Sequence, residues 1–141
     1  MIYTQLTRQA MILAYQAHHG QTDKSGVPYI FHPIHLAEQM PDEYTTCVAL
    51  LHDIVEDTQV TLAELEQMFP AEVTEAVALL THLDGTDYIE YINAIKENPI
   101  ARTVKLADLA HNTDTSRLIE PSLSAQKRFE MKYKTALEIL K

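Results

Sequence analysis

Apolar residues recur at helical spacing along almost the whole chain. Leu6, Ala10, Leu13 and Ala17 repeat at intervals of three or four residues, which is the spacing of one face of an α-helix. No window alternates for long between apolar and polar residues, as a half-buried strand would. The pattern therefore predicts an all-α fold, a compact single bundle of about seven helices joined by short connections.

Start and stop signals give the expected bounds of these helices. A first helix over 3–19 ends at Gly20, and after a loop rich in glycine and proline a second begins near Pro33 and runs to about Met40. The third is expected as one continuous helix over 43–57. Further helices are expected from Thr61 to Phe69, from Pro70 onward, and over 87–97, 99–113 and 122–140, with Ser122 as the cap of the last one.

Length and charge limit the classes of protein to which the chain can belong. With 141 residues, 46% of them hydrophobic, it can form one domain with its own core, which we expect over 1–141. A net charge of −9 disfavours binding to the phosphates of nucleic acid or to an anionic membrane. No apolar run approaches the roughly 20 residues that span a bilayer, and the single cysteine, Cys47, excludes an intrachain disulfide. We expect a cytoplasmic protein with no nucleic-acid or membrane partner.

The adjacent pair His52 and Asp53 places polar groups inside the apolar run 49–57. In a continuous helix, Glu56 would lie one turn beyond His52 and Asp57 one turn beyond Asp53. Three carboxylates so close together repel one another, and a divalent cation held by imidazole and carboxylate would offset that repulsion. The local pattern alone fits a metal site and a solvated acidic helix face equally well.

Two other segments carry further candidate ligands. Asp108 lies in the helix expected over 99–113, and His32 lies just before the second expected helix. Taken alone, the first is typical of a surface carboxylate and the second of a packed or capping histidine. Together with His52 and Asp53 they supply two imidazoles and two carboxylates, a set that suits Mn²⁺, Fe²⁺ or Zn²⁺ with positions left open to water.

The order of these residues resembles the HD-domain phosphohydrolases, whose motif is His, then His-Asp, then Asp. The sequence is most similar to their Rel/Spo branch, the alarmone hydrolases. The resemblance extends over residues 15 to about 118, and three blocks in the same order carry it: 17–26 with 28–33, 50–58, and 105–108 followed by His111 and Asn112.

The resemblance implies a hydrolase that removes the 3′-pyrophosphate from guanosine tetra- or pentaphosphate, a small nucleotide substrate. It implies Mn²⁺, or another divalent transition metal, held by His32, His52, Asp53 and Asp108. Glu56 and Asp57 would then be the catalytic acidic pair. Glu56 is the first choice for the carboxylate that orients or deprotonates the attacking water.

Five further residues are expected to contact the substrate. Lys24 and Lys105 would offset phosphate charge, and Asn112 would hydrogen-bond the sugar or a phosphate. Arg117 and Tyr88 are weaker candidates for the same pocket.

The sequence also departs from the pattern of the family. Asp23 stands where the family's first loop has an arginine near the base, and Leu109 replaces another arginine in the third block. Two alternatives therefore stay open: a phosphohydrolase of another nucleotide or phosphate ester, and a metal- or nucleotide-binding module without turnover. Because the sequence ends at residue 141, we expect no synthetase domain and no bifunctional enzyme. The sequence gives no oligomeric state.

Overall fold

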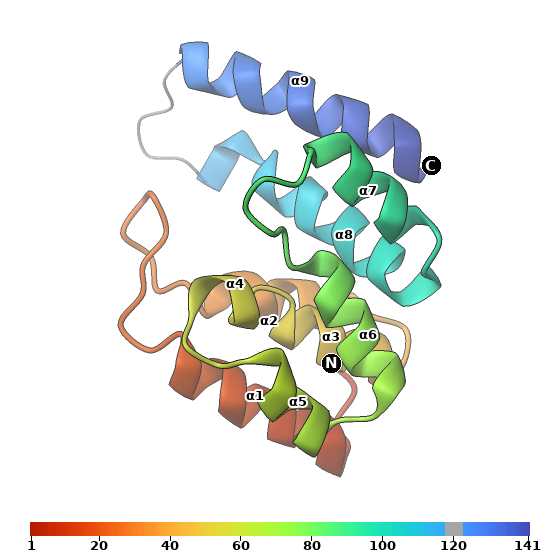
Figure 1. The fold of residues 1–141 in the computed structure, drawn as a ribbon. Helices are drawn as coiled ribbons and strands as arrows, with labels where there is room; N and C mark the ends of the chain where they lie inside the picture. The colour runs from red at the N-terminus through yellow and green to blue at the C-terminus, as the bar shows by residue number, and fades with distance from the viewer. Residues whose placement is uncertain (118–122) are drawn as a thin grey trace.

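The computed structural model describes the backbone of residues 1–117 and 123–141, and the side chains of residues 1–117 and 131–141 (Figure 1). The described residues are helical and contain no strand beyond one isolated bridge between Thr22 and Pro28, which confirms the predicted all-α class. The elements are α1 (Gln5–Ala17), α2 (Phe31–Glu38), α3 (Glu43–Leu51), α4 (Ile54–Asp57), α5 (Leu62–Met68), α6 (Ala71–Leu80), α7 (Tyr88–Lys96), α8 (Pro99–Asn112), the short 3₁₀ helix η1 (Thr115–Arg117) and α9 (Leu123–Leu140).

Side-chain caps fix where several of these helices begin. Thr4 accepts a hydrogen bond from the Thr7 amide at the start of α1, and Asp42 accepts one from the Thr45 amide at the start of α3. Both caps are reciprocal, because the third helical residue in turn accepts from the cap's own amide. At α8, Asn98 caps the helix and Pro99 occupies its first position, where a missing N–H costs nothing.

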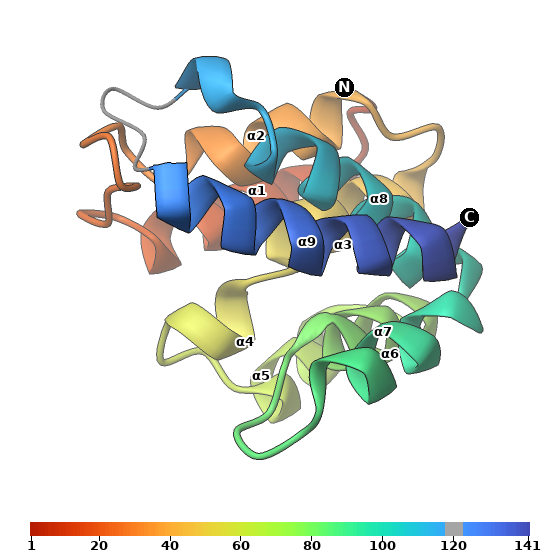
Figure 2. The same ribbon diagram turned by 90° about the horizontal axis from the view of Figure 1, so that it is seen from above.

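Helix α3 is the centre of the bundle. Every residue from Thr45 to Leu51 is buried, as expected for a helix that is apolar on all sides. It packs against α1, α2, α6 and α8, while α9 lies across α7 and α8 (Figures 1 and 2). The C-terminal end of α3 therefore delivers residues 52 and 53 into the interior of the molecule.

The prediction of one continuous helix over 43–57 is wrong. Helix α3 ends at Leu51 and α4 begins at Ile54, so His52 and Asp53 lie in the turn between them. The His52 ring bonds back to the Ala49 carbonyl, with 2.7 Å between Nδ1 and the oxygen, and Asp53 leaves the helical region with φ −103° and ψ 1°. Polar side chains that bond to nearby backbone compete with the helix ladder, and the His52 bond coincides with the end of α3, at the two residues proposed to bind metal.

Two further predictions concern the residues at which helices begin. Helix α2 begins at Phe31, two residues before the expected Pro33, so His32 lies in its first turn. The expected cap of the last helix, Ser122, lies outside the described residues. None of the described helices is both long enough and apolar enough to span a bilayer.

Candidate metal centre and active site

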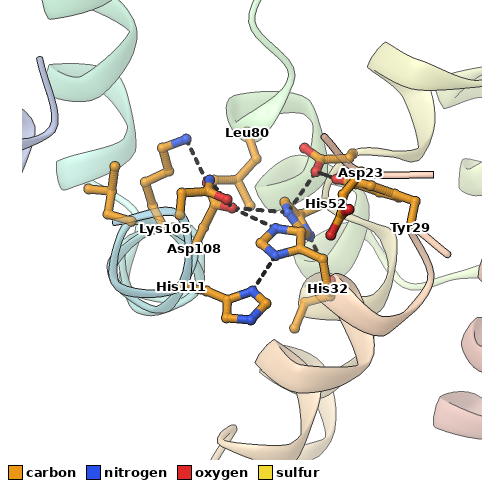
Figure 3. Close-up of polar contacts among 12 residues, drawn as sticks. Asp23, Tyr29, His32, His52, Leu80, Lys105, Asp108 and His111 are labelled. Atoms are coloured by element: carbon orange, nitrogen blue, oxygen red, sulfur yellow. Dashed lines mark hydrogen bonds and ion pairs between the residues drawn. The ribbon is translucent and has the colours of Figure 1, made fainter. Parts of the chain in front are cut away.

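The four expected metal ligands meet at the inner end of α3. His32 comes from α2, Asp108 from α8, and His52 and Asp53 from the turn after α3. His32 Nε2 lies 2.9 Å and His52 Nε2 3.5 Å from Asp108 Oδ1 (Figure 3). His52 Nε2 also lies 3.0 Å from Asp53 Oδ2. Ligand atoms of His32, His52 and Asp53 all lie within 4.8 Å of one another, so one cation can reach all three.

The hydrogen bonding of His52 shows that these residues fit a metal ion. In the neutral ring, the short contact of Nδ1 with the Ala49 carbonyl favours the tautomer that carries its proton on Nδ1, which leaves the lone pair of Nε2 free for a metal ion. Nε2 is fully buried and has no hydrogen bond of normal geometry. A bare buried nitrogen that faces two carboxylates is unfavourable alone, but it is the arrangement required of an imidazole ligand.

The charges of the cluster indicate the same need for a cation. Burial alone would raise the pKa of Asp53, but the adjacent His52 outweighs it and lowers the pKa. Burial likewise opposes ionisation of Asp108, and Lys105 with the two imidazoles holds its pKa well below the usual value. In return, the Asp53 carboxylate outweighs burial and raises the pKa of His52. Two ionised carboxylates thus attract positive charge to the centre, either a proton on His52 or a metal ion.

Neighbouring residues hold the carboxylates of the expected ligands in place. The Tyr29 hydroxyl donates to Asp53 Oδ2. Lys105 Nζ lies 2.9 Å from Asp108 Oδ2, and Asn112 Nδ2 donates to Asp108 Oδ1 over 3.1 Å. Lys105 and Asn112 were expected to contact substrate, and the structure places both against Asp108. Outer contacts of this kind orient the ligands of a metal and tune its chemistry.

Sequence reasoning gave no role to Tyr29 or to His111, although both lie in the blocks that carry the family resemblance. Tyr29 precedes His32 by three residues, and this spacing was the only available signal that the two side chains could share a face. His111 Nδ1 lies 2.7 Å from His32 Nδ1 (Figure 3). Burial, followed by the charge of Arg117, lowers the pKa of His111 to about 4, so its ring is neutral near pH 7.

The expected acidic pair lies on the outer side of Asp53. Carboxylate oxygens of Asp53, Glu56 and Asp57 lie within 4.8 Å of one another, and both members of the pair are exposed. Glu56 Oε1 accepts a hydrogen bond from the His82 amide at 2.6 Å. Partial burial, followed by the charges of Asp53 and Glu56, raises the pKa of Asp57 to about 6. A carboxylate with such a pKa can gain and lose protons close to neutral pH.

The remaining expected substrate contacts lie farther out. Arg117 donates from Nη1 to the His111 carbonyl at 2.8 Å, and its Nη2 lies 3.7 Å from Asp23 Oδ2. Lys24 is exposed in the same loop as Asp23. The Tyr88 ring packs 5.8 Å from Tyr91, and its buried hydroxyl has no hydrogen-bond partner.

The raised pKa of Asp57 predicts how the stability of the metal-free protein depends on pH. Its carboxyl has a pKa of about 6 in the folded chain against an ordinary value of 3.8. Between these values the folded state holds more protons than the unfolded state, so the free energy of unfolding falls as pH rises through the window. Asp57→Asn should reduce this fall, by a small amount because the side chain is partly exposed.

Urea unfolding in EDTA at about pH 4.5 and about pH 7 measures this effect. The matched control is Asp84→Asn, which removes an exposed carboxylate from the loop between α6 and α7. The control should follow the pH dependence of the wild type. An Asp57→Asn protein with the same dependence as wild type would contradict the assignment.

Comparisons with known proteins bear on the family to which the chain belongs. The profile of the HD domain family matches residues 10–117, which include His32, His52, Asp53 and Asp108. The bifunctional (p)ppGpp synthase/hydrolase SpoT of Escherichia coli K12 is 37% identical, over 81% of this chain and 18% of SpoT. A guanosine-3′,5′-bis(diphosphate) 3′-pyrophosphohydrolase of Escherichia coli O157:H7 has the same identity and coverage. The chain thus spans less than a fifth of the length of these relatives.

A solved structure shares the fold. It is that of a metazoan orthologue of SpoT, described as hydrolysing ppGpp, and it aligns with a TM-score of 0.86 over 100% of this chain and 88% of its own. The sequence identity is 21%, so this likeness concerns the fold alone. The family profile covers most of the described bundle and the site within it. By sequence and by fold, the chain belongs to the HD domain family.

Proposed function

We propose that the protein is a metal-dependent hydrolase of the cytoplasm, acting as one domain over residues 1–141, that removes the 3′-pyrophosphate from guanosine tetra- or pentaphosphate. The observation that carries the proposal is the buried His52 Nε2, which makes no hydrogen bond of normal geometry and faces Asp53 and Asp108 beside His32. The names of the relatives support the same substrate class, because one of them is a guanosine-3′,5′-bis(diphosphate) 3′-pyrophosphohydrolase.

His32, His52, Asp53 and Asp108 would hold the metal, for which we propose Mn²⁺. A bound divalent ion supplies Lewis-acid polarisation of a phosphoryl oxygen and lowers the pKa of a water molecule. The chain supplies the carboxylates that orient that water. Glu56 is the first choice for the carboxylate that orients or deprotonates this water, since its backbone-anchored carboxylate lies beside Asp53. Asp57, whose pKa is raised to about 6, is the alternative base.

Basic and polar groups around the centre would bind the substrate. Lys105 and Lys24 would offset phosphate charge. Asn112 and Arg117 offer further hydrogen-bond donors, and the Tyr88 ring would form part of the pocket wall. Lys105 is already paired with Asp108, so it would serve the substrate only by sharing its charge between the ligand carboxylate and a phosphate.

Pyrophosphate release is the direct test. Purified protein with Mn²⁺ should release pyrophosphate from guanosine tetraphosphate, and EDTA should stop the reaction. Other nucleotides and phosphate esters form the comparison set. Activity confined to one of those would favour the different-substrate alternative, and metal binding with no turnover on any substrate would favour the binding module.

Asp23 gives a specific reason to examine base selection. Its Oδ1 accepts from the Ser25 amide at 2.8 Å and the Val27 amide at 3.0 Å, while its Oδ2 faces Arg117. Asp23 thus closes the turn of its loop and offers no cation to a base. We expect guanosine tetraphosphate to be hydrolysed, with weaker preference for guanine over adenine than in relatives that keep the loop arginine.

The expected gain from Asp23→Arg is about a few-fold to thirty-fold in preference for guanine, which corresponds to about 0.5 to 2 kcal/mol for a stacked guanidinium. The change also removes the two loop hydrogen bonds, so Asp23→Ala is the necessary control. Hydrolysis of guanosine and adenosine 3′-pyrophosphate substrates is compared across the three proteins. Strict guanine preference in the wild type, unchanged in both variants, would show that this loop does not read the base.

A further inference from the structure

Both ring nitrogens of His32 have partners, and the two partners differ. Nε2 faces Asp108 at 2.9 Å, on the side of His52 and Asp53, whereas Nδ1 faces His111 Nδ1 at 2.7 Å on the opposite side (Figure 3). The rings of His32 and His111 are almost parallel, with 7° between their planes. His111 lies outside the set of residues assigned above to metal or substrate.

The protonation of the two rings follows from this geometry. If His32 Nε2 binds a metal ion, it carries no proton, so the proton of the neutral ring must sit on Nδ1. Nδ1 then donates to His111 Nδ1, which must be a bare acceptor. A hydrogen bond from the outer nitrogen fixes both the tautomer and the orientation of a histidine ligand.

His111 is itself held from two other directions. Arg117 Nη1 donates to its backbone carbonyl at 2.8 Å. The exposed ring of His35 stacks on its ring, with 4.1 Å between centroids. The Arg117 contact holds the backbone at the end of α8, and the stacking contact supports the ring itself. The His111 ring therefore faces His32 in the metal-free protein, so little order would have to be gained on binding.

We propose that His111 is a positioning residue: its Nδ1 accepts a hydrogen bond from the Nδ1–H group of His32 and so orients His32 Nε2 toward the metal. The inference rests on the proposed metal site. In most sites of this kind the acceptor is a carboxylate or a backbone carbonyl. Here a neutral imidazole takes that place, so the ligand is oriented without adding a further negative charge beside Asp53 and Asp108.

Three variants test the inference. His111→Phe removes the acceptor but keeps a ring against His35. His111→Asn restores an acceptor oxygen at about the position of Nδ1. The matched control is His19→Phe, which removes an exposed imidazole that stacks only on Tyr15 among the described rings.

The first readout is affinity for Zn²⁺ and Mn²⁺, measured by competition with a chelator. His111→Phe should bind about 10- to 100-fold more weakly than wild type, while His111→Asn and His19→Phe should stay close to wild type. Far-UV circular dichroism checks that each variant is folded. Equal affinity in wild type and His111→Phe, or equal loss in His111→Phe and His111→Asn, would overturn the role of the acceptor.

The second readout is ¹⁵N NMR of the zinc-loaded protein. We expect His32 to carry its proton on Nδ1 and His111 to have a bare Nδ1, with the shared proton protected from exchange. In His111→Phe this protection should be lost, which a merely structural role would not produce. A wild type that binds no metal would overturn the proposed metal site as well, whereas normal binding with a protonated His111 Nδ1 would overturn only this inference.

Discussion

Replacing Asp53 with alanine is expected to abolish metal binding and, with it, hydrolysis. Asp53 is the proposed ligand that lies next to both the buried His52 Nε2 and the acidic pair. Loss of an outer partner weakens metal sites by about 10- to 100-fold, so loss of a charged ligand should exceed about 100-fold. Without Asp53, the attraction for positive charge at His52 also falls, which removes part of the driving force for any cation.

Metal content after dialysis and chelator competition measures this loss. Asp53→Ala also deprives the Tyr29 hydroxyl of its acceptor, so a change in folding must be separated from a change in ligation. Asp53→Asn serves this purpose, because it keeps an oxygen near Tyr29 but lacks the charge. Full metal occupancy in Asp53→Ala would show that the ion is held elsewhere.

The sequence was sufficient for the fold class and for the convergence of the four proposed ligands. Helical periodicity is a local property, and the caps at Thr4, Asp42 and Asn98 are local as well. The three sequence blocks, in the order found in the family, grouped His32 and Asp108 with His52 and Asp53 in one predicted site. The positions of His32 and Asp108 differ by 76 residues.

The interruption between α3 and α4 could not be predicted from the same pattern. Apolar spacing continues through Ile54 and Val55, so periodicity alone favours an unbroken helix over 43–57. At the break, His52 bonds back to the Ala49 carbonyl, and Asp53 accepts a hydrogen bond from Tyr29, a contact that forms only in the folded chain. Tertiary contacts of this kind override local preference where a site requires it.

The outer contacts of the centre were missed for a related reason. The pairing of His111 with His32 joins residues 79 apart in sequence, and nothing in the local pattern of α8 distinguishes His111 from an ordinary helix residue. In the sequence, Asp23 was notable only because it stands where the family has an arginine. The structure shows that it also closes the turn of its loop and pairs with Arg117, which is a structural role that composition cannot reveal.

Glu56→Gln is expected to keep the metal and to lose about 10²- to 10⁴-fold in turnover, the usual cost of losing a general base. Glu56 is not among the residues that converge on His52 Nε2, so metal affinity should stay close to wild type. The glutamine oxygen can still accept from the His82 amide, which Glu56 Oε1 now does at 2.6 Å. The variant therefore removes the charge while the backbone anchor of α4 remains.

Turnover and metal content should be measured on the same preparations of Glu56→Gln, Asp57→Asn and the control Glu66→Gln, which alters an exposed carboxylate on α5. The control should match wild type in both measurements. Near-normal turnover in Glu56→Gln together with a large loss in Asp57→Asn would transfer the role of base to Asp57, whose raised pKa already suits proton transfer. Near-normal turnover in both variants would mean that neither carboxylate acts as the base. Loss of metal from Glu56→Gln would instead make Glu56 part of the metal site, because a group that only orients water is not required to hold the ion.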